Sequence, residues 1–569
     1  MKKSMRAIAL TVASMATLSS VVACDNGLSG PNGPGGGTDK YYISTRDSGL
    51  GYDWLEALAE DFTAQTGLEV VVVPERGNTG DELANTYASS PYIVSFCESM
   101  EYSALARSGL LYDISSIVKA DLADGTGTIE SKLYDDQKAY LTAYDGNYYS
   151  LPWGATFNGI TYDAEVLQNK NLYFADANGE KPNATSSYTG KAYTGRGFVS
   201  ASNTKLAPGP DGKYNTYDDG LPSSYEEFFY MCDQMVAKGV VPFIYCGASD
   251  HYLNYVFQAL LLANTGAKEL SYHFSFDSKG ETTNIITGFN GDEPVVTPMT
   301  ISNDNGYVIK QQEGMYYALK FLYKLFTTNG YFYDGCEVKG FTNHQAFTQF
   351  VEGKWSNNPT AMLIEGNYWY REAAQEHQDS IDAHGATAKN RQFKFLTMPG
   401  QELGTVNENE GSAPAVADSL SNYLVVNKNI TGDAKKVEVA EKFLKFVFQD
   451  SSLQKYTTIA NMPNAVKYNI TDAQYDSMCT YGKSTWDIYK AAKEANNWTS
   501  AVSGSLTYLQ NPVQFKFGTA YYFFNTKLAN GQSVELPKTA FREKGLNAKD
   551  YFLGMAISES AWNTQYKVN

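Results

Sequence analysis

The sequence predicts an α/β protein with two lobes, and three observations lead to this prediction. Apolar patterns with the spacing of strands and of helices alternate from residue 41 onward, which is typical of strands joined by crossover helices. The chain has 569 residues, more than one hydrophobic core usually serves. Outside the first 24 residues, no apolar stretch is long enough to cross a membrane as a helix.

The first lobe opens with a βαβ pattern. The first helix places its apolar residues on one face and ends at Gly67, before a continuous β-branched run. Buried strands of this kind are typical of a parallel sheet covered by helices. The expected elements, in order, are a strand at 41–44, a helix at 53–66, a strand at 68–73, a helix at 81–88 and a strand at 92–96.

Ligands of such sheets bind beyond the carboxyl ends of the strands, which here are the loops 44–54, 74–79 and 97–102. Tyr52 and Trp54 follow the first strand. Glu98 and Ser99 follow the third. Aromatic residues make up 14% of the chain, and tyrosine alone accounts for 43 residues. Aromatic faces with hydroxyl groups suit stacking on sugar rings, although a large core with an aromatic surface would give the same composition.

The first 24 residues predict a lipoprotein signal. Lys2, Lys3 and Arg6 precede a short apolar run that ends before Cys24. We expect cleavage before Cys24 and a lipid on that cysteine, followed by a flexible tether at 24–38 that is rich in Gly, Asn and Pro. Val21 stands where a leucine is usual, so an ordinary secretory peptide is the alternative.

Charge and cysteine content exclude several classes of protein. A net charge of −17 argues against nucleic acid or anionic lipid as the binding partner. Five cysteines follow Cys24 without Cys-x-x-Cys spacing, which indicates neither a zinc ribbon nor a complete disulfide framework. We expect buried thiols, with one disulfide left open.

Several segments, in order, resemble the extracellular solute-binding protein family 1 of carbohydrate ABC importers. Each is weak alone, but together they span roughly residues 41 to 465. The segments are GYDW at 51–54 with TG at 66–67, SGLLYDI at 108–114, YSLPW at 149–153 with GITYD at 159–163, LPSSYEEF at 221–228 with GVVP at 239–242, GK at 353–354 with AMLIEGNYW at 361–369, and AEKFLKFV at 440–447 with Gln454 and Pro463.

The resemblance implies a periplasmic-binding-protein-like fold, in which two lobes of discontinuous segments close on a ligand through a hinge. The insertion at 168–220 departs from compact members. The expected parts are the signal peptide at 1–23, the tether at 24–38, the N-lobe at 39–155 and 411–462, and the C-lobe at 156–410 and 463–569.

The resemblance also implies ligand contacts. Glu98 is the best candidate for binding sugar hydroxyls, with an exposed loop carboxylate as the alternative. Trp153 and Trp369 match positions where sugar-binding members present aromatic rings, with hinge or lobe packing as the alternative, and Tyr252 could replace Tyr255. The predicted ligand-binding residues are Tyr52, Trp54, Glu98, Ser99, Trp153, Tyr255, Trp369 and Tyr370.

The end of the insertion has oxygen ligands at the spacing of a calcium loop. Asp211, Asn215, the Tyr217 carbonyl and Asp219 fall at loop positions one, five, seven and nine. Position three is a lysine and position twelve a proline, so this is no orthodox EF-hand. Larger oligosaccharide-binding members of the family have such a loop, which implies a structural calcium. A turn rich in Asx caps is the alternative.

No motif predicts catalysis. The sequence has no Gly-x-Ser-x-Gly or His-Glu-x-x-His, and its five histidines do not cluster. The run at 482–484, GKS, is similar to the end of a phosphate loop, but Ser477 stands where that loop needs glycine. Acid pairs occur by chance among 62 acidic residues.

We therefore expect a monomeric, lipid-anchored, extracytoplasmic protein that is not an enzyme and requires no cofactor. It would bind a carbohydrate, most plausibly an oligosaccharide, and deliver it to an ABC permease. The alternatives are the same architecture binding a non-sugar solute or acting as a sensor, and a surface glycan hydrolase or lyase.

Overall fold

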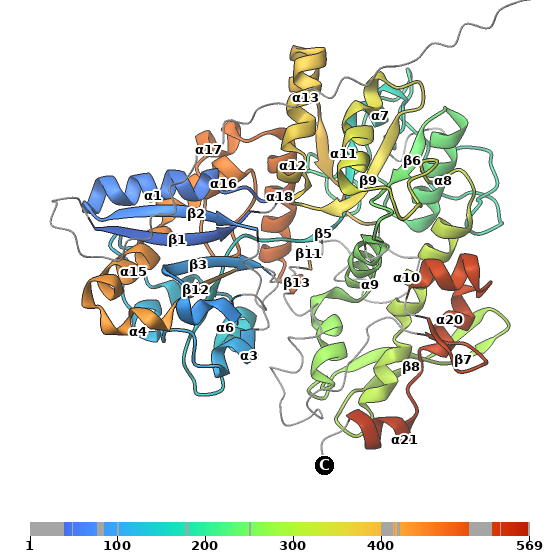
Figure 1. The fold of residues 1–569 in the computed structure, drawn as a ribbon. Coiled ribbons are helices and arrows are strands. Elements are labelled where there is room, and N and C mark those ends of the chain that lie inside the picture. The colour runs from blue at the N-terminus through green and yellow to red at the C-terminus, as the bar shows by residue number, and fades with distance from the viewer. Residues whose placement is uncertain are drawn as a thin grey trace, which may run out of the picture. The chain divides into compact units, whose positions relative to one another are not determined.

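The structure is a computed structural model of the chain, and it shows a mixed α/β protein (Figure 1). The predicted signal peptide, the whole predicted tether with Cys24, and Ser99 lie outside the described residues. In the part that is described, no helix is long and apolar enough to cross a membrane. The described residues are 39–47, 49–76, 83, 85–98, 102–176, 179, 181–249, 252–399, 414, 416–417, 422–499, 526–534 and 536–566.

The first sheet confirms the expected βαβ opening. β1 pairs in parallel with β2 on one side and β3 on the other, and β12 joins β3 and β4 in antiparallel pairing. The helix α1 (Asp53–Thr66) has the predicted bounds, and its C-cap Gly67 adopts a φ of 69°, which favours glycine. In spatial order the strands are β2 (Glu69–Glu75), β1 (Lys40–Arg46), β3 (Tyr92–Glu98), β12 (Asn422–Val426) and β4 (Ser150–Pro152).

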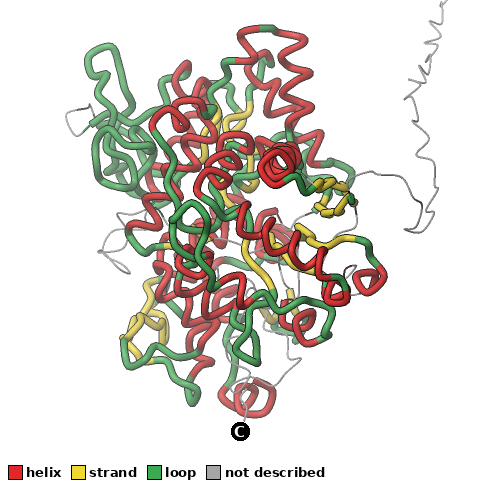
Figure 2. Tube along the Cα trace, turned by 90° about the vertical axis from the view of Figure 1, so that its left-hand side faces the viewer, coloured by secondary structure: helices red, strands yellow, loops and turns green. Residues whose placement is uncertain are grey.

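The second sheet begins where the chain leaves β4. Its strand β5 pairs antiparallel with β10 and β9, and β6 pairs in parallel with β9. All residues of β9 and β6 are buried, since helices lie around the strands in both views (Figures 1 and 2). The order is β10 (Phe393–Phe395), β5 (Asn158–Asp163), β9 (Thr360–Gly366) and β6 (Val241–Ile244).

Each sheet has its own hydrophobic core, and both cores draw on segments far apart in the chain. The first core takes residues from 41–153 and 423–466, and the second takes residues from 155–416 and 465–555. The boundary at Trp153 and Ala155 coincides with the passage from β4 to β5. Ligand sites are common where such discontinuous lobes meet.

Helices and hairpins complete the two lobes. The long helix α9 contains Gly266 in a non-helical conformation, with a φ of 70°, so it is kinked there. The main elements are α3 (Tyr102–Arg107), α6 (Asp135–Leu141), α7 (Ala164–Asn169), α8 (Tyr225–Ala237), α9 (Leu253–Ser275), β7 (Thr282–Asn290), β8 (Glu293–Thr300), α10 (Glu313–Thr327), α11 (Asn343–Val351), α12 (Trp369–Glu372), α13 (Ala374–His384), β11 (Val416–Ala417), α15 (Ala434–Val447), α16 (Asp450–Ala460), α17 (Asp472–Ser477), α18 (Thr480–Glu494), β13 (Trp498–Thr499) and α20 (Ala548–Gly554).

The described part of the predicted insertion forms loops between α7 and α8. Arg196 fixes it to α8 through an ion pair with Glu227 at 2.5 Å, and Tyr193 stacks on Tyr230 with ring centroids 4.3 Å apart. Gly209 has a φ of +61°, and a Cβ there would lie 2.2 Å from the carbonyl oxygen of Asp218. Only glycine therefore fits at this close approach.

The cysteines of the described part are free thiols, and all but the half-buried Cys479 are buried, as expected. The buried ones are Cys97, Cys232, Cys246 and Cys336.

Candidate functional site

A small hollow opens at the carboxyl ends of β1 and β3, the edge of the first sheet that the strand order predicts for a ligand. Its volume is about 20 Å³, roughly the room that one water molecule needs. Aromatic rings and polar groups converge on it. Its lining includes Arg46, Trp54, Glu98, Trp153 and Asn422.

Two tryptophans form one wall of this strand-end hollow. Trp54 and Trp153 stack with centroids 5.2 Å apart, and each is only 3% exposed. The indole N–H of Trp54 donates to the Gly51 carbonyl at 3.0 Å. The indole N–H of Trp153 is buried and has no hydrogen-bond partner among the described residues. An unpaired buried donor is costly, so an oxygen in the hollow would stabilise it.

A charged pair stands beside the tryptophans. Arg46, the last residue of β1, lies 3.2 Å from a carboxylate oxygen of Glu98, the last residue of β3. The distance is that of an ion pair, but the Nε–H of Arg46 makes no hydrogen bond with any described residue. Both side chains are partly exposed, at 29% and 22%, and can therefore still donate to and accept from a ligand.

Residues of the second lobe approach the same edge through α12. A Cβ on Gly49 would lie 1.6 Å from Cγ of Glu372, so the loop after β1 packs directly on this glutamate. Burial, and after it the charge of Glu98, raises the pKa of Glu372 to about 7. Glu372 and Glu98 therefore face each other closely enough for their charges to interact.

Tyrosines surround a second buried glutamate near Glu372. Glu365, at the end of β9, is 1% exposed, and its burial and the charge of Glu372 raise its pKa well above the ordinary value. Tyr368 donates a hydrogen bond of 3.2 Å to the hydroxyl of Tyr255 on α9. We call Tyr255, Glu365, Tyr368 and Glu372 the glutamate–tyrosine group.

Arg371 fixes α12 to the first lobe. Its guanidinium forms an ion pair with Asp53 at the start of α1, and it lies 3.4 Å from the Leu50 carbonyl and 3.5 Å from the Ile459 carbonyl. A guanidinium with several donors suits such a contact among three segments.

The structure brings only some of the predicted ligand residues to the hollow. Trp54, Glu98 and Trp153 line it, and Tyr255 belongs to the facing group. Tyr52 is half-buried directly before α1, and it does not line the hollow.

Trp369 and Tyr370 lie elsewhere, in the second core. Trp369 is 0% exposed and packs against Phe350 and Phe393 at 5.3 and 5.2 Å, and Tyr370 stacks on Tyr481 at 5.5 Å. In this arrangement α12 buries Trp369 and turns its neighbours Arg371 and Glu372 toward the first lobe. This placement corresponds to the packing alternative for Trp369.

Sequence reasoning missed Arg46, Glu365, Arg371 and Glu372. The signal was present for one of them, because Glu365 is the penultimate residue of a buried strand and Glu98 is the last residue of another. The roles of Arg371 and Glu372 depend on which face of a one-turn helix points to the other lobe, and sequence does not specify that face.

The predicted calcium loop places its acids differently from the loop positions that the sequence indicated. Asp211 is 6% exposed and Asp218 is 0% exposed, and burial followed by the charge of Asp211 raises the pKa of Asp218 to about 7. Asp219 instead accepts from the backbone N–H groups of Asn215 and Thr216, at 2.8 and 3.3 Å. The buried acid pair is therefore Asp211 and Asp218, and no ion pair to a cationic side chain joins either of them in the described part of the chain.

The hydroxyl of Tyr217, in the same loop, is buried, and no described residue forms a hydrogen bond with it. Among the described residues, no group of three or more His, Cys, Asp or Glu side chains is placed to hold a metal ion. Two carboxylates with loop carbonyls remain as the donor set that a calcium ion would use here.

Residues 47–203 match the family described as bacterial extracellular solute-binding protein. This range includes the loop after β1, most of the lining of the strand-end hollow and the start of the second sheet. No curated protein matches the chain.

Several solved structures are similar to this chain at low sequence identity. A protein from work on xylan utilization by the thermophilic bacterium Caldanaerobius polysaccharolyticus is 14% identical, with a TM-score of 0.52 over 91% of this chain and 99% of that one. RafE from Streptococcus pneumoniae is 15% identical, with a TM-score of 0.46 over 84% and 99%. A chitin oligosaccharide binding protein is 14% identical, with a TM-score of 0.46 over 80% and 90%. The chain thus has the two-lobed fold of solute-binding proteins.

Proposed function

We propose that this protein is the substrate-binding subunit of an ABC importer and that it captures a carbohydrate between its two lobes. One observation supports this above the others: the segment that matches the solute-binding family contains most of the strand-end hollow, where aromatic and charged groups converge. The ligand would contact Trp153 and Glu98 on one lobe and the glutamate–tyrosine group on the other. The ligand can favour lobe closure by no more free energy than the difference between its affinities for the closed and the open form.

The chemistry of the hollow supports a hydroxyl-rich ligand. The unpaired N–H of Trp153 donates, Glu98 accepts, and Arg46 donates, so adjacent hydroxyls of a sugar ring could satisfy all three. The family whose model matches residues 47–203 is described as solute-binding, so we propose a binding protein and not an enzyme.

The test is a thermal-shift screen of the purified protein against mono-, di- and oligosaccharides, with product analysis of every hit. A ligand at 100 times its dissociation constant stabilises the fold by about 2.7 kcal/mol. A selective shift without product supports the proposal. A shift with non-sugar solutes only supports the sensor or non-sugar alternative, and consumption of the sugar supports a hydrolase or lyase.

Glu98→Gln tests the site itself. The change keeps the shape but removes the charge that accepts from hydroxyls, so we expect about a tenfold loss of affinity, or 1.4 kcal/mol. Glu56→Gln, on the exposed face of α1, is the matched control and should leave affinity unchanged. If both variants bind the ligand as tightly as the wild type, Glu98 is not part of the ligand-binding site.

We also propose that lipid on Cys24 anchors the protein outside the cytoplasm, as the amino-terminal sequence predicts. Cys24→Ala should release the protein from the membrane fraction into the soluble fraction, and labelling with a fatty-acid analogue should be lost. Retention of both in the variant would contradict lipidation at this residue.

A further inference from the structure

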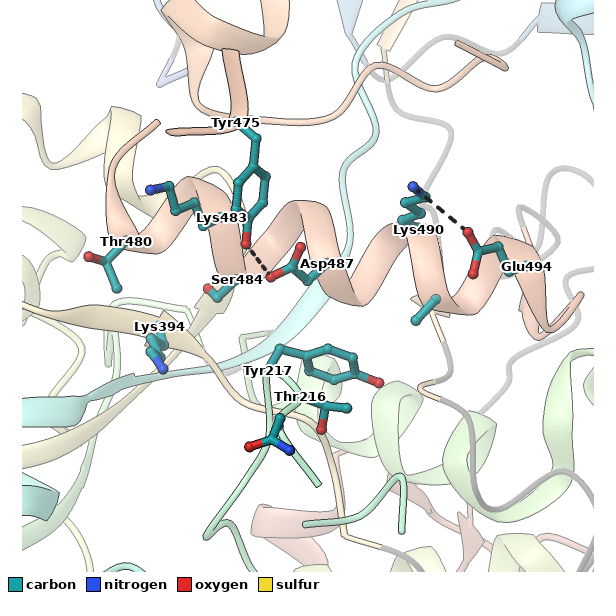
Figure 3. A pocket seen from close by; sticks show the side chains of 12 residues that line it. Thr216, Tyr217, Lys394, Tyr475, Thr480, Lys483, Ser484, Asp487, Lys490 and Glu494 are labelled. Atoms are coloured by element: carbon teal, nitrogen blue, oxygen red, sulfur yellow. Dashed lines mark hydrogen bonds and ion pairs between the residues drawn. The ribbon is translucent and has the colours of Figure 1, made fainter. Parts of the chain in front are cut away.

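A large polar pocket lies beside α18, and it shares no lining residue with the strand-end hollow. Its volume is about 640 Å³, within the range of small-molecule sites. Figure 3 shows its walls: α18 on one side, the loop that contains Thr216 and Tyr217 on another, and Lys394 of β10 between them.

Three lysines line this α18 pocket in a chain whose net charge is −17. Lys394 comes from β10, and Lys483 and Lys490 come from α18. The charges of all three act on Asp487, which accepts a hydrogen bond from Tyr475 at 2.8 Å. Within the described residues no ion pair joins Asp487 to any of the three, so its single charge does not neutralise them by contact.

The other acids near the pocket make only weak contacts. Lys490 lies 3.9 Å from Glu494, and Lys483 lies 4.0 Å from Asp476, in exposed pairs that contribute little in water. Burial lowers the pKa of Lys394, although Asp487 and Asp219 oppose that effect, and the part of the chain described gives Lys394 no ion pair. An anion among these lysines would therefore be stabilised.

Ring faces and a hydroxyl complete the pocket. In the described part of the chain the buried hydroxyl of Tyr217 has no hydrogen-bond partner, and the ring of Tyr475 faces Lys483 at 5.3 Å. The hydroxyl of Ser484 is already paired, since it accepts from the N–H of Phe395 at 2.9 Å and donates to the Tyr481 carbonyl at 2.8 Å. The GKS run therefore is not a phosphate loop, but its lysine does line the pocket.

We propose that the α18 pocket is a second binding site, for a sugar that bears a carboxylate or a phosphate. The anionic group would lie among Lys394, Lys483 and Lys490, where flexible ammonium groups can each donate to it. The sugar ring would lie toward Tyr217 and Tyr475, whose hydroxyl and ring face suit its polar edge and apolar face. The site is separate from the hollow and does not depend on the identity of the transported solute.

Calorimetric titration of the full chain at low salt tests this site. The probes are glucuronate, glucose 6-phosphate, inorganic phosphate and glucose. We expect one of the two anionic sugars to bind and glucose not to bind at this site, with an affinity that falls as salt rises. The tighter of the two sugars identifies the anion as carboxylate or phosphate. No binding of either, or equal binding of glucose, would overturn the proposal, and inorganic phosphate binding as tightly as the sugars would mean an adventitious ion only.

Lys394→Met should weaken the anionic sugar at least about tenfold, or 1.4 kcal/mol, with Lys442→Met on the exposed face of α15 as the matched control. Lys483→Met, at a more exposed position, gives the same test if Lys394→Met unfolds. Unchanged affinity in both pocket variants would place the ligand elsewhere. Binding of a neutral sugar at the strand-end hollow should persist in these variants, so failure here and failure of the importer proposal are distinguishable.

Discussion

The stacked pair Trp54 and Trp153 has a packing role and leaves one polar atom for binding. Phe96 and Tyr456 contact both rings edge-on, at 5.1 to 5.3 Å, so the pair sits in an aromatic cluster of the first core. Large buried aromatics of this kind dominate the energy of a core. Trp54 is thus a buried core residue, and its burial limits the ring surface that it could offer to a sugar, as the sequence predicts it to do.

Trp54→Ala should lower the free energy of unfolding by about 3 to 5 kcal/mol, because it leaves a cavity between Trp153 and Tyr456. Urea unfolding followed by circular dichroism measures this loss. Tyr52→Ala, two residues earlier and half-buried, is the control and should cost much less. Equal costs for the two would show that the stack does not stabilise the lobe.

Trp153→Phe separates binding from packing. An aromatic ring is kept, although a smaller one, and the unpaired N–H is removed. Ligand affinity should therefore fall by about tenfold, while the unfolding free energy changes less than in Trp54→Ala. Titration of wild type and variant with the sugar found in the screen checks this. An unchanged affinity would mean that this N–H does not reach the ligand.

The raised pKa of Glu372 should make the free energy of unfolding fall as pH rises. Its folded pKa is raised to about 7, so between its unfolded value and pH 7 the folded state binds the extra proton. The stabilisation is complete below about pH 4 and is lost by about pH 7, with a size on the order of 1 to 3 kcal/mol. Glu372→Gln should flatten this part of the pH–stability curve measured by urea unfolding. A curve of equal slope in the variant would contradict the assignment.

Among the larger elements, the loop before α8 illustrates that a spacing rule does not specify which acids of a loop become buried. The loop positions of a calcium site pointed to Asp219, but folding turns Asp219 toward the loop's own backbone and buries Asp218 beside Asp211. The Gly209 contact with the Asp218 carbonyl fixes that arrangement. We propose that a structural calcium, if bound, is held by Asp211 and Asp218.

Added calcium should therefore raise the melting temperature at pH 7.5. At 100 times its dissociation constant, calcium should add about 2.7 kcal/mol to the free energy of unfolding. The effect should be smaller at pH 5, because a proton on Asp218, whose pKa is about 7, competes with the ion. Asp218→Asn should abolish the response and Asp219→Asn should retain it. The reverse pattern would restore the ligand set that the sequence indicated, and no response in the wild type would leave the Asx-turn alternative.

For the whole molecule, substitution can test how α12 is joined to the first lobe. Arg371 makes this link by contacting Asp53, Leu50 and Ile459. Arg371→Ala should raise the radius of gyration measured by small-angle X-ray scattering of the ligand-free protein, because that contact favours approach of the lobes. A saturating ligand should lower it again. Lys549→Ala, on α20, is the control. Identical scattering of both variants would show that Arg371 does not influence closure.

The early elements could be predicted because local pattern decides them. The helix at 53–66 has an apolar face, a glycine stop and no competing signal, so prediction and structure agree at both ends. The carboxyl-end rule then placed Trp54 and Glu98 at the right edge of the sheet, since strand direction in a βαβ unit is fixed by the sequence order.

The facing half of the site could not be predicted in the same way. Trp369 and Glu372 belong to one helical turn, and which of them points to the core depends on how β9 and α11 pack against it. The lysines of the α18 pocket come from residues 394, 483 and 490, which only the pairing of β10 with β5 and the packing of α18 bring together.

Local periodicity, glycine stops and charge thus determined the βαβ opening, the α/β class and the loops that end its strands, because these depend on neighbours within one turn or one strand. The pairing of Glu98 with Arg46, the burial of Trp369 and the approach of Glu372 to Gly49 were decided only in the folded molecule. They join separate segments of the chain, such as Gly49 and Glu372. Their energies come from burial and from charges brought close together, which no local pattern encodes.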